Sequence, residues 1–139
     1  MSEGFVADAS VGMAWAVESQ SSAETKDLLD RVASGVSFVV PVFWPFEVAN
    51  ALLMLVRRRR MTPEDFVRVR VDFGIAKPVI DTEGPRLAWS DITELAEKFG
   101  LTIYDAAYLE LAIRRGLPLA SRDSSLNEAA RLRGVKTLL

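Results

Sequence analysis

Short apolar runs alternate along the chain with segments in which apolar residues recur every three or four positions. The short runs predict buried strands over residues 4–8, 37–41, 78–81 and 117–121, and a last strand over 135–139. Runs of this length, bounded by Gly, Pro or polar residues, are typical of strands in the interior of a sheet.

The segments with helical spacing predict helices over 22–34, 44–59, 85–99 and 103–115, one beginning at Pro63 and one near Ser124. Several carry boundary signals, such as Thr62 before Pro63 and a glycine directly after residues 99 and 115. Strands that alternate with helices are typical of parallel βαβ units. We therefore predict an α/β fold, a three-layer α/β/α sandwich with a central, mainly parallel sheet, and one domain over residues 1–139.

Four carboxylates lie inside or at the end of these apolar segments. They are Asp8, Glu47, Asp105 and Asp123. An acidic side chain in such a place is costly unless it is paired or binds a cation. Asp8 ends the predicted strand 4–8 and Asp123 lies just past the predicted strand 117–121, where parallel sheets bind their ligands. The other two share apolar faces of predicted helices. The pattern predicts that all four converge on one site.

Each acid also has a purely structural interpretation. Glu47 and Asp105 fall near helix starts, where an acid interacts favourably with the helix dipole. Asp123 would cap the helix at Ser124, and Asp8 would be a turn residue. Convergence would require a counter-charge, because two carboxylates about 5 Å apart repel by roughly 3 kcal/mol at an effective dielectric constant of about 20. An oxygen-only site of this kind favours Mg²⁺ or Mn²⁺.

Composition narrows the chemistry. The chain has no histidine and no cysteine, which excludes Ser-His-Asp and Cys-His catalysis, the usual zinc sites, disulfides and histidine-based RNA cleavage through the 2′-hydroxyl. Hydrolysis would then depend on carboxylates and metal-activated water. The start M-S-E-G-F lacks the features of a signal peptide, and no apolar run is long enough to span a membrane. We expect a cytoplasmic protein.

Other polar residues have candidate roles around the acids. The hydroxyls of Ser10 and Ser121 would orient a carboxylate or a metal-bound water, or make ordinary loop hydrogen bonds, and Asn50 shares a helical face with Glu47. Although the net charge is −2, a basic run lies at the end of the helix 44–59; it consists of Arg57, Arg58, Arg59 and Arg60. This run would contact RNA phosphates, or form a solvated helix end.

The sequence around these residues resembles the PIN domain family, in particular VapC-type toxins of bacterial type II toxin–antitoxin pairs. The resemblance rests on V-A-D-A-S-V around Asp8, E-V-A-N-A-L from Glu47, Y-D-A-A-Y-L-E-L-A from Tyr104 and S-R-D-S-S-L from Ser121. These motifs cover nearly the whole chain in the family's order. Ser121 departs mildly from the usual Thr but keeps the hydroxyl.

The resemblance implies a Mg²⁺- or Mn²⁺-dependent ribonuclease that forms a homodimer and is inhibited by a small cognate antitoxin. At the matching positions, Asp8, Glu47, Asp105 and Asp123 would hold the metal, supported by Asn50 and Ser121. We predict an endoribonuclease, the toxin of such a pair, that leaves 5′-phosphate and 3′-hydroxyl ends. Two alternatives stay open: a catalytically idle PIN-fold binding protein, and a phosphatase or phosphoreceiver domain. The phosphatase and phosphoreceiver sites require a second acid near Asp8, which is missing.

The helix 44–56 is apolar on more than one face. Such a helix is either covered by its neighbours or presents an interaction surface. We expect part of this surface to bind an antitoxin helix, or the second subunit of a homodimer.

Overall fold

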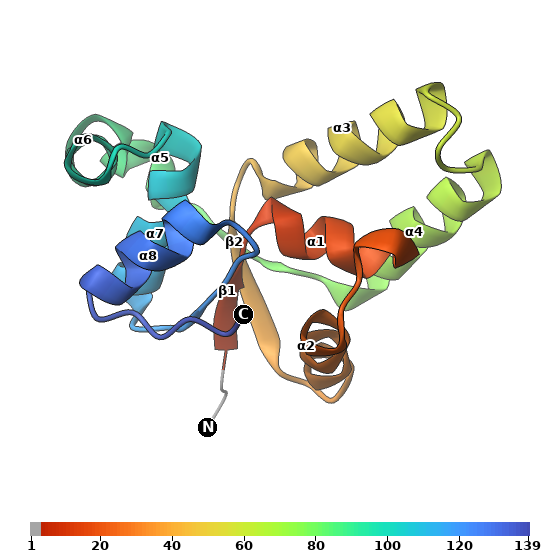
Figure 1. The fold of residues 1–139 in the computed structure, drawn as a ribbon, viewed down its shortest axis with the longest axis horizontal. Coiled ribbons are helices and arrows are strands. Elements are labelled where there is room, and N and C mark those ends of the chain that lie inside the picture. The colour runs from red at the N-terminus through yellow and green to blue at the C-terminus, as the bar shows by residue number, and fades with distance from the viewer. Residues whose placement is uncertain (1–3) are drawn as a thin grey trace.

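A parallel sheet of 4 strands forms the centre of the molecule in the computed structural model, which describes residues 4–139 (Figure 1). The strands are β1 Gly4–Ala7, β2 Ser37–Pro41, β3 Val79–Asp81 and β4 Leu119–Ala120. The helices are α1 Ala9–Ala16, α2 Ala23–Ala33, α3 Trp44–Arg57, α4 Pro63–Ala76, α5 Gly84–Leu87, α6 Thr93–Phe99, α7 Ile103–Arg115 and α8 Ser124–Leu132, with a 3₁₀ turn Glu18–Gln20 and a π-helical turn Ala88–Ile92.

Helices cover both faces of this sheet. Figure 1 shows α1 to α4 on one side and α5 to α8 on the other, so the predicted three-layer α/β/α sandwich is confirmed. The core on the α1–α3 side is aromatic: the ring of Phe38 lies 5.1 Å from that of Trp15 and 5.6 Å from that of Trp44. α1 and α3 approach closely at Gly12, where a Cβ atom would lie 2.7 Å from the Trp44 ring. A side chain there would push the two helices apart.

The order of the strands positions the polar loops. The sheet runs β3-β2-β1-β4, all pairs are parallel, and Val6 of β1 lies between Val39 and Leu119. β1 is followed in sequence by β2 on one side, whereas its other neighbour is β4. The carboxyl ends of β1 and β4 therefore meet at a topological switch point, which is where open α/β sheets bind ligands. Asp8 follows β1 at this edge, and Ser121 follows β4.

α1 is the element that the sequence pattern misses. Asp8 does not end the first strand; it is the N-cap of α1, and its side chain accepts a hydrogen bond from the Val11 N–H. The helix is short and carries Gly12, which lowers helix propensity. Its apolar residues also run almost without a break, so they show no helical period. Packing against α3 stabilises it in spite of its local sequence.

Two further predictions are wrong in part. The expected helix over 85–99 is divided into α5, a π-helical turn and α6. The hydroxyl of Thr93 donates to the Ala88 carbonyl across this turn at 2.6 Å. The expected last strand over 135–139 is reduced to a single bridge between Thr137 and Leu119, because only this short stretch reaches the edge of β4.

α3 and α4 form a hairpin that projects from the sheet (Figure 1). Only Trp44, Val48 and Leu52 of α3 are buried, so α3 is not covered all round. Phe46, on its outer side, is 77% exposed. Among residues 4–139 no helix has the length and apolar character needed to cross a membrane. The prediction that the chain has no signal peptide rests partly on residues 1–3, which lie outside the described range.

Candidate active site

The four predicted acids all lie at helix N-termini. Asp8 and Asp123 are the N-caps of α1 and α8, while Glu47 and Asp105 lie in the first turns of α3 and α7. We call these four residues the strand-end acids. The partial positive charge of a helix N-terminus favours a carboxylate, so each acid has the capping or dipole role that a structural interpretation assigns to it. The same four N-termini face the carboxyl edge of the sheet.

Asp8 is the buried member of the set, 5% exposed. One carboxylate oxygen accepts hydrogen bonds from the Ser10 hydroxyl and the Val11 N–H, and the other accepts from the Ser121 hydroxyl. Burial raises the pKa of Asp8 above its ordinary value, and the bonds from Ser10, Ser121 and Val11 work in the opposite direction.

The two hydroxyls have fixed orientations. The Ser10 oxygen accepts the backbone N–H of Arg122, and the Ser121 oxygen accepts that of Asp123, each at 3.0 Å. Because each oxygen already accepts a proton, each hydroxyl has its own proton free to donate to Asp8. The loops after β1 and β4 are joined through one carboxylate in this way, which fixes the position of Asp8.

Glu47 is held from α7. The Tyr108 hydroxyl donates to its Oε1 at 3.2 Å, although the two residues are 61 positions apart in sequence. Glu47 is exposed as a residue, but partial burial of its carboxylate raises its pKa; the bond from Tyr108 lowers this pKa, and the charges of Asp105 and Asp8 raise it further. Tyr108 is itself buried, and desolvation with the Glu47 charge raises its pKa, so its hydroxyl keeps its proton and serves as a donor.

Asp105 faces the other acids from the start of α7. Its backbone N–H donates to the N-cap hydroxyl of Thr102 at 3.1 Å. Burial raises the pKa of Asp105, followed by the charges of Asp123 and Asp8. At the start of α8, one oxygen of Asp123 accepts the Leu126 N–H at 3.1 Å. The mutual charge effects link all four acids electrostatically.

The side chains, as they stand, are not drawn together around one point. No three acidic groups among residues 4–139 lie close enough to share a metal ion. The donor chemistry nevertheless fits a hard cation, because all four groups are carboxylates and none of them takes part in an ion pair within this range. Asp8 accepts three hydrogen bonds, which leaves about one of the roughly four lone-pair positions of a carboxylate free.

Three residues support the site without having been predicted to do so. Tyr108 holds Glu47, the Trp44 indole N–H donates to the Asp8 carbonyl at 3.0 Å, and the Asn127 side-chain amide donates to the Ser121 carbonyl at 2.8 Å. Tyr108 had a signal in the sequence, because it lies one turn after Asp105 on the same face. Asn127 lies one turn after Asp123 and is buried. The Trp44 contact has no local signal.

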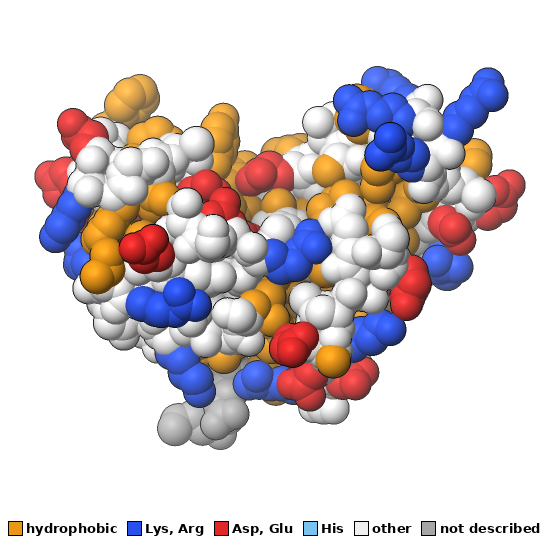
Figure 2. All heavy atoms as spheres, in the orientation of Figure 1, with side chains coloured by type: hydrophobic (Ala, Val, Ile, Leu, Met, Phe, Trp, Pro, Cys, Tyr) orange, Lys and Arg blue, Asp and Glu red, His pale blue; other side chains and the backbone are white. Residues whose placement is uncertain are grey.

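The remaining predicted residues lie along α3. Asn50 is exposed one turn after Glu47, and the basic run is exposed at the tip of the α3–α4 hairpin. Figure 2 shows Lys and Arg side chains gathered at this tip, and the surface hollowed between the α3–α4 hairpin and the α5–α6 lobe, with acidic side chains near the floor of the hollow. Glu47 and Arg57 are ten residues apart, so the basic run begins roughly 15 Å along α3 from the acids.

A second acidic cluster lies at the same edge of the sheet, where β3 ends. Asp81, at the end of β3, accepts two hydrogen bonds from the Arg114 guanidinium at 2.9 Å and one from Arg115 at 3.3 Å. Arg114 also forms an ion pair with Glu110, which lies four residues earlier on α7 and is buried. We call these four residues the Asp81 cluster. Hydrogen bonds from Arg114, the largest of several effects, lower the pKa of Asp81 to about 2.

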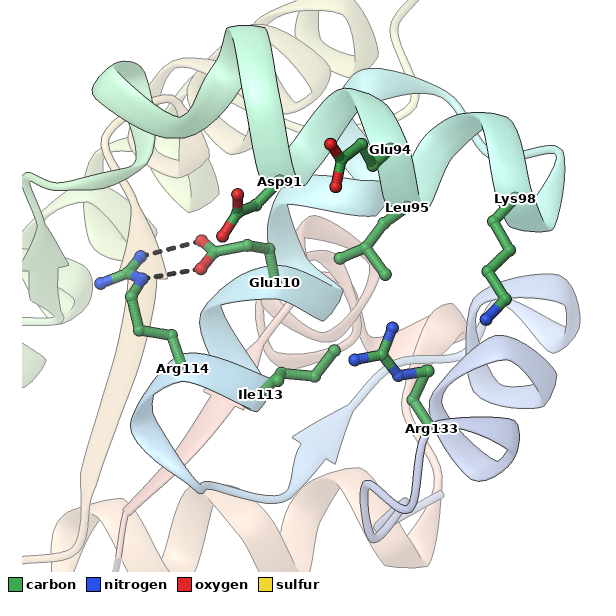
Figure 3. Close-up of a pocket in the computed structure, with 8 residues that line it drawn as sticks. All are labelled: Asp91, Glu94, Leu95, Lys98, Glu110, Ile113, Arg114 and Arg133. Atoms are coloured by element: carbon green, nitrogen blue, oxygen red, sulfur yellow. Dashed lines mark hydrogen bonds and ion pairs between the residues drawn. The ribbon is translucent and has the colours of Figure 1, made fainter.

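A cavity of about 600 Å³ lies beside this cluster, between α6 and α7 (Figure 3). Asp91 and Glu94 line it at one end, and Lys98 and Arg133 at the other. Two of its polar groups, Glu110 and Arg114, are bonded to each other across its wall. None of the strand-end acids lines this cavity, so the cavity and the predicted chemistry lie in different places.

Comparison with known proteins gives one family and several similar folds. The family model described as PIN domain matches residues 5–132. A search of curated proteins gave no match. PAE2754 from Pyrobaculum aerophilum has a crystal structure that is similar to this chain, with 22% sequence identity and a TM-score of 0.66, over 99% of this chain and 84% of that one.

Two further solved structures are similar in fold. FitAcB from Neisseria gonorrhoeae is 14% identical with a TM-score of 0.64, over 96% of this chain and 95% of that chain. VapBC2 from Rickettsia felis, bound to a DNA fragment from their promoter, is 12% identical with a TM-score of 0.65, over 96% of each chain. At these identities the likeness concerns the fold.

Proposed function

Because this chain belongs to the PIN domain family, whose members are generally nucleases that use divalent metal ions, we propose that it is a metal-dependent endoribonuclease. We propose further that it is the toxin of a toxin–antitoxin pair, with residues 1–139 as one nuclease domain. The strand-end acids Asp8, Glu47, Asp105 and Asp123 are its site residues, and Mg²⁺ or Mn²⁺ is its cofactor.

One observation carries this proposal. Four carboxylates from four helix N-termini face one edge of the sheet, three of them have raised pKa values, and no basic side chain among residues 4–139 is paired with them. Carboxylates at one edge of the sheet without a counter-charge are unfavourable in the protein alone. Groups whose pKa values are raised by burial and by each other are typical of functional sites. A divalent cation held by oxygen ligands supplies the missing charge.

The residues of the proposed site have different roles. Asp8 is fixed by Ser10 and Ser121, and Glu47 is held by Tyr108, so these two acids are preorganised. Asp105 and Asp123 each have at least one carboxylate oxygen without a hydrogen bond from residues 4–139, so their side chains would turn towards the ion. When bound, the cation supplies positive charge that stabilises the phosphoryl oxygens and lowers the pKa of water. Asn50, one turn from Glu47, is placed to orient the substrate at the rim.

The proposed reaction is hydrolysis by water and not transfer to the 2′-hydroxyl. Without histidine the chain lacks the usual base for the 2′-hydroxyl route. Water then attacks phosphorus in line, the bond from phosphorus to the 3′-oxygen breaks, and the 3′-oxygen takes up a proton. The products carry a 5′-phosphate and a 3′-hydroxyl.

End-labelled single-stranded RNA tests this chemistry directly. With Mg²⁺ or Mn²⁺, wild-type protein should give fragments with 5′-phosphate ends, and a chelator should stop the reaction. A single 2′-deoxy nucleotide at the mapped cut should leave cleavage intact, because the 2′-hydroxyl is not the nucleophile. Fragments ending in a 2′,3′-cyclic phosphate would contradict the mechanism. Binding of RNA or protein with no cleavage under any metal would favour the idle binding protein instead.

The partner of the toxin would dock beside the acids. A groove of about 290 Å³ lies between α3 and α4 and is lined by apolar side chains that include Trp44, Val48 and Phe73. An antitoxin segment with an apolar helical face fits such a groove, and an arginine on it would pair with Glu47 nearby. This assignment takes support from the likeness in fold to FitAcB and VapBC2.

A homodimer would use a different surface. Val67, Val71 and Ile75 form a stripe on α4 at intervals of four residues, and they are 50%, 55% and 73% exposed. Exposed apolar stripes of this kind are typical of subunit contacts. Sedimentation of the wild type against Val71→Asp tests the assignment: the wild type should be a dimer and the variant a monomer. A monomeric wild type would remove it.

A further inference from the structure

An apolar slot opens beside the strand-end acids. It has a volume of about 190 Å³ and is lined by the end of β2, the start of α5, the π-helical turn and the first turn of α7. Phe43, Pro85, Ala88, Ile92, Ile103 and Tyr104 make up most of its wall. We call it the aromatic slot. The π-helical turn places Ala88 and Ile92 on its wall, while Trp89 from the same turn is 91% exposed and does not line it.

Aromatic contacts connect the slot to the acids. The ring of Phe43 lies 5.1 Å from that of Tyr104 and 5.4 Å from that of Tyr108, both edge to face. Tyr108 in turn donates its hydroxyl to Glu47. Tyr104 also directly precedes Asp105 in α7. A group seated in the slot would therefore lie next to whatever the acids hold.

The lining determines what kind of group fits. Among residues 4–139, Asp81 is the only charged residue in the wall, and its oxygens are already bonded by Arg114, Arg115 and the Gly84 N–H. The slot therefore offers apolar contact and an aromatic ring, with no free charged group. Tyr104 is 59% exposed, so its ring is open to a ligand. The slot is smaller than the roughly 300–1,000 Å³ of pockets for drug-sized ligands, which suits a single flat ring system.

We propose that the aromatic slot holds one unstacked nucleobase of the RNA strand, next to the phosphodiester bond that is cut. The inference rests on the nuclease function proposed above and adds a base-binding subsite to it. Single-stranded nucleic acids are commonly held by stacking of bases on aromatic side chains. Because no free charged group faces the base, the slot recognises the face of the ring and not its hydrogen-bonding edge. All four bases are accepted at this position, and a missing base is not.

Abasic scanning tests the subsite. Short single-stranded RNAs of one sequence, each with one abasic ribonucleotide near the mapped cut, are titrated with protein in the absence of divalent metal. Wild type should bind the RNA that is abasic at one flanking position about 5- to 150-fold more weakly than the parent. Tyr104→Ala should bind the parent RNA more weakly than wild type does, by a similar factor. It should bind that abasic RNA almost as tightly as it binds the parent. Tyr104→Phe should behave as wild type.

Trp89→Ala is the matched control, since it removes an exposed aromatic ring that does not line the slot. It should keep the full abasic effect. The subsite is wrong if Tyr104→Ala and the abasic nucleotide act independently, so that their losses multiply, or if Tyr104→Ala alters sedimentation, which would assign the slot to a second copy of the chain. If Mg²⁺-dependent cleavage of the parent RNA persists in either case, the nuclease function stands without the subsite. If the parent is neither bound nor cut, both proposals fall.

Discussion

Two groups of carboxylates at the same edge of the sheet have opposite electrostatic settings. In the Asp81 cluster, a buried aspartate is paired with Arg114 and Arg115, and its pKa is lowered to about 2. Among the strand-end acids, burial raises the pKa values of Asp8, Glu47 and Asp105, and neighbouring carboxylates raise those of Glu47 and Asp105 further. Within residues 4–139, arginines pair with the first group, and no basic side chain pairs with the second.

The difference separates a structural role from a functional one. Arg114 ties the end of β3 to α7 and satisfies both of its buried acids, so the Asp81 cluster is complete within the chain. The strand-end acids have hydroxyl, amide and phenol donors but no cation. Carboxylates without a counter-charge in the protein favour the binding of a cation from solution. The comparison therefore supports the proposal that the strand-end acids, and not the Asp81 cluster, bind a metal.

Arg114→Ala should show the largest effect. It leaves Asp81 and Glu110, which are 1% and 5% exposed, without their shared cation. Removing one partner from a buried ion pair costs about 3–5 kcal/mol. Urea unfolding should show this loss, whereas Arg68→Ala, which breaks an exposed pair with Asp65, should cost less than about 1 kcal/mol. Equal losses in the two variants would mean that the Asp81 cluster has no special structural role.

Asp105→Asn should have the opposite profile. The amide keeps the shape of the side chain but removes a charge from the strand-end acids. RNA cleavage should fall by about 10²- to 10³-fold, while the melting temperature without metal stays the same or rises because repulsion is relieved. Asp72→Asn, at an exposed position on α4, is the control and should retain activity. Retained cleavage in Asp105→Asn would remove this residue from the site.

The pH dependence of stability should distinguish the clusters by sign. A raised carboxyl pKa means that the folded state binds protons before the unfolded state does, so stability without metal should rise as the pH falls from 7 towards about 5. Asp81 acts in reverse: its contribution is present above its ordinary pKa of 3.8 and is lost as the pH falls through about 2. Melting curves should show a smaller acid-side rise in Asp105→Asn. An unchanged rise would contradict the charge coupling.

The basic run at the hairpin tip should have the smallest effect. Each arginine that contacts a phosphate of single-stranded RNA contributes about 0.7 to the slope of log K against log salt. Replacing Arg57 to Arg60 with Gln should flatten this slope for RNAs that span the roughly 15 Å from the acids to the tip. Very short RNAs should not respond. Identical slopes for both lengths, before and after the substitution, would leave the run as a solvated helix end.

The sequence predicts the bounds of α7, and the face on which Asp105 lies, from local signals. Thr102 caps the helix, Gly116 ends it, and the apolar period places Asp105 on the same face as Tyr108. The same reasoning fails at α1, where Gly12 and an unbroken apolar run hide the helical period. There the deciding contact is with Trp44, on another helix. The π-helical turn after α5 likewise has no signal in the periodicity of residues 85–99.

The candidate site shows the same limit. Strand ends and helical faces were enough to select the four strand-end acids. The groups that hold them lie far away in sequence: Tyr108 bonds Glu47 across 61 positions, and the Trp44 indole bonds the Asp8 carbonyl across 36. Pairings of this kind depend on how the helices pack on the sheet. The contrast between paired and unpaired acids also needs the structure, because Arg114 and Asp81 are 33 positions apart in sequence.

Thermal or chemical unfolding with and without Mg²⁺ tests the central claim most directly, namely that the strand-end acids form an uncompensated metal site. At about 100 times the dissociation constant, Mg²⁺ should stabilise the wild type by about 2.7 kcal/mol. Arg68→Ala should gain as much as the wild type, and Asp105→Asn should gain much less. The claim is contradicted if saturating Mg²⁺ or Mn²⁺ leaves wild-type stability unchanged, or if it stabilises Asp105→Asn equally.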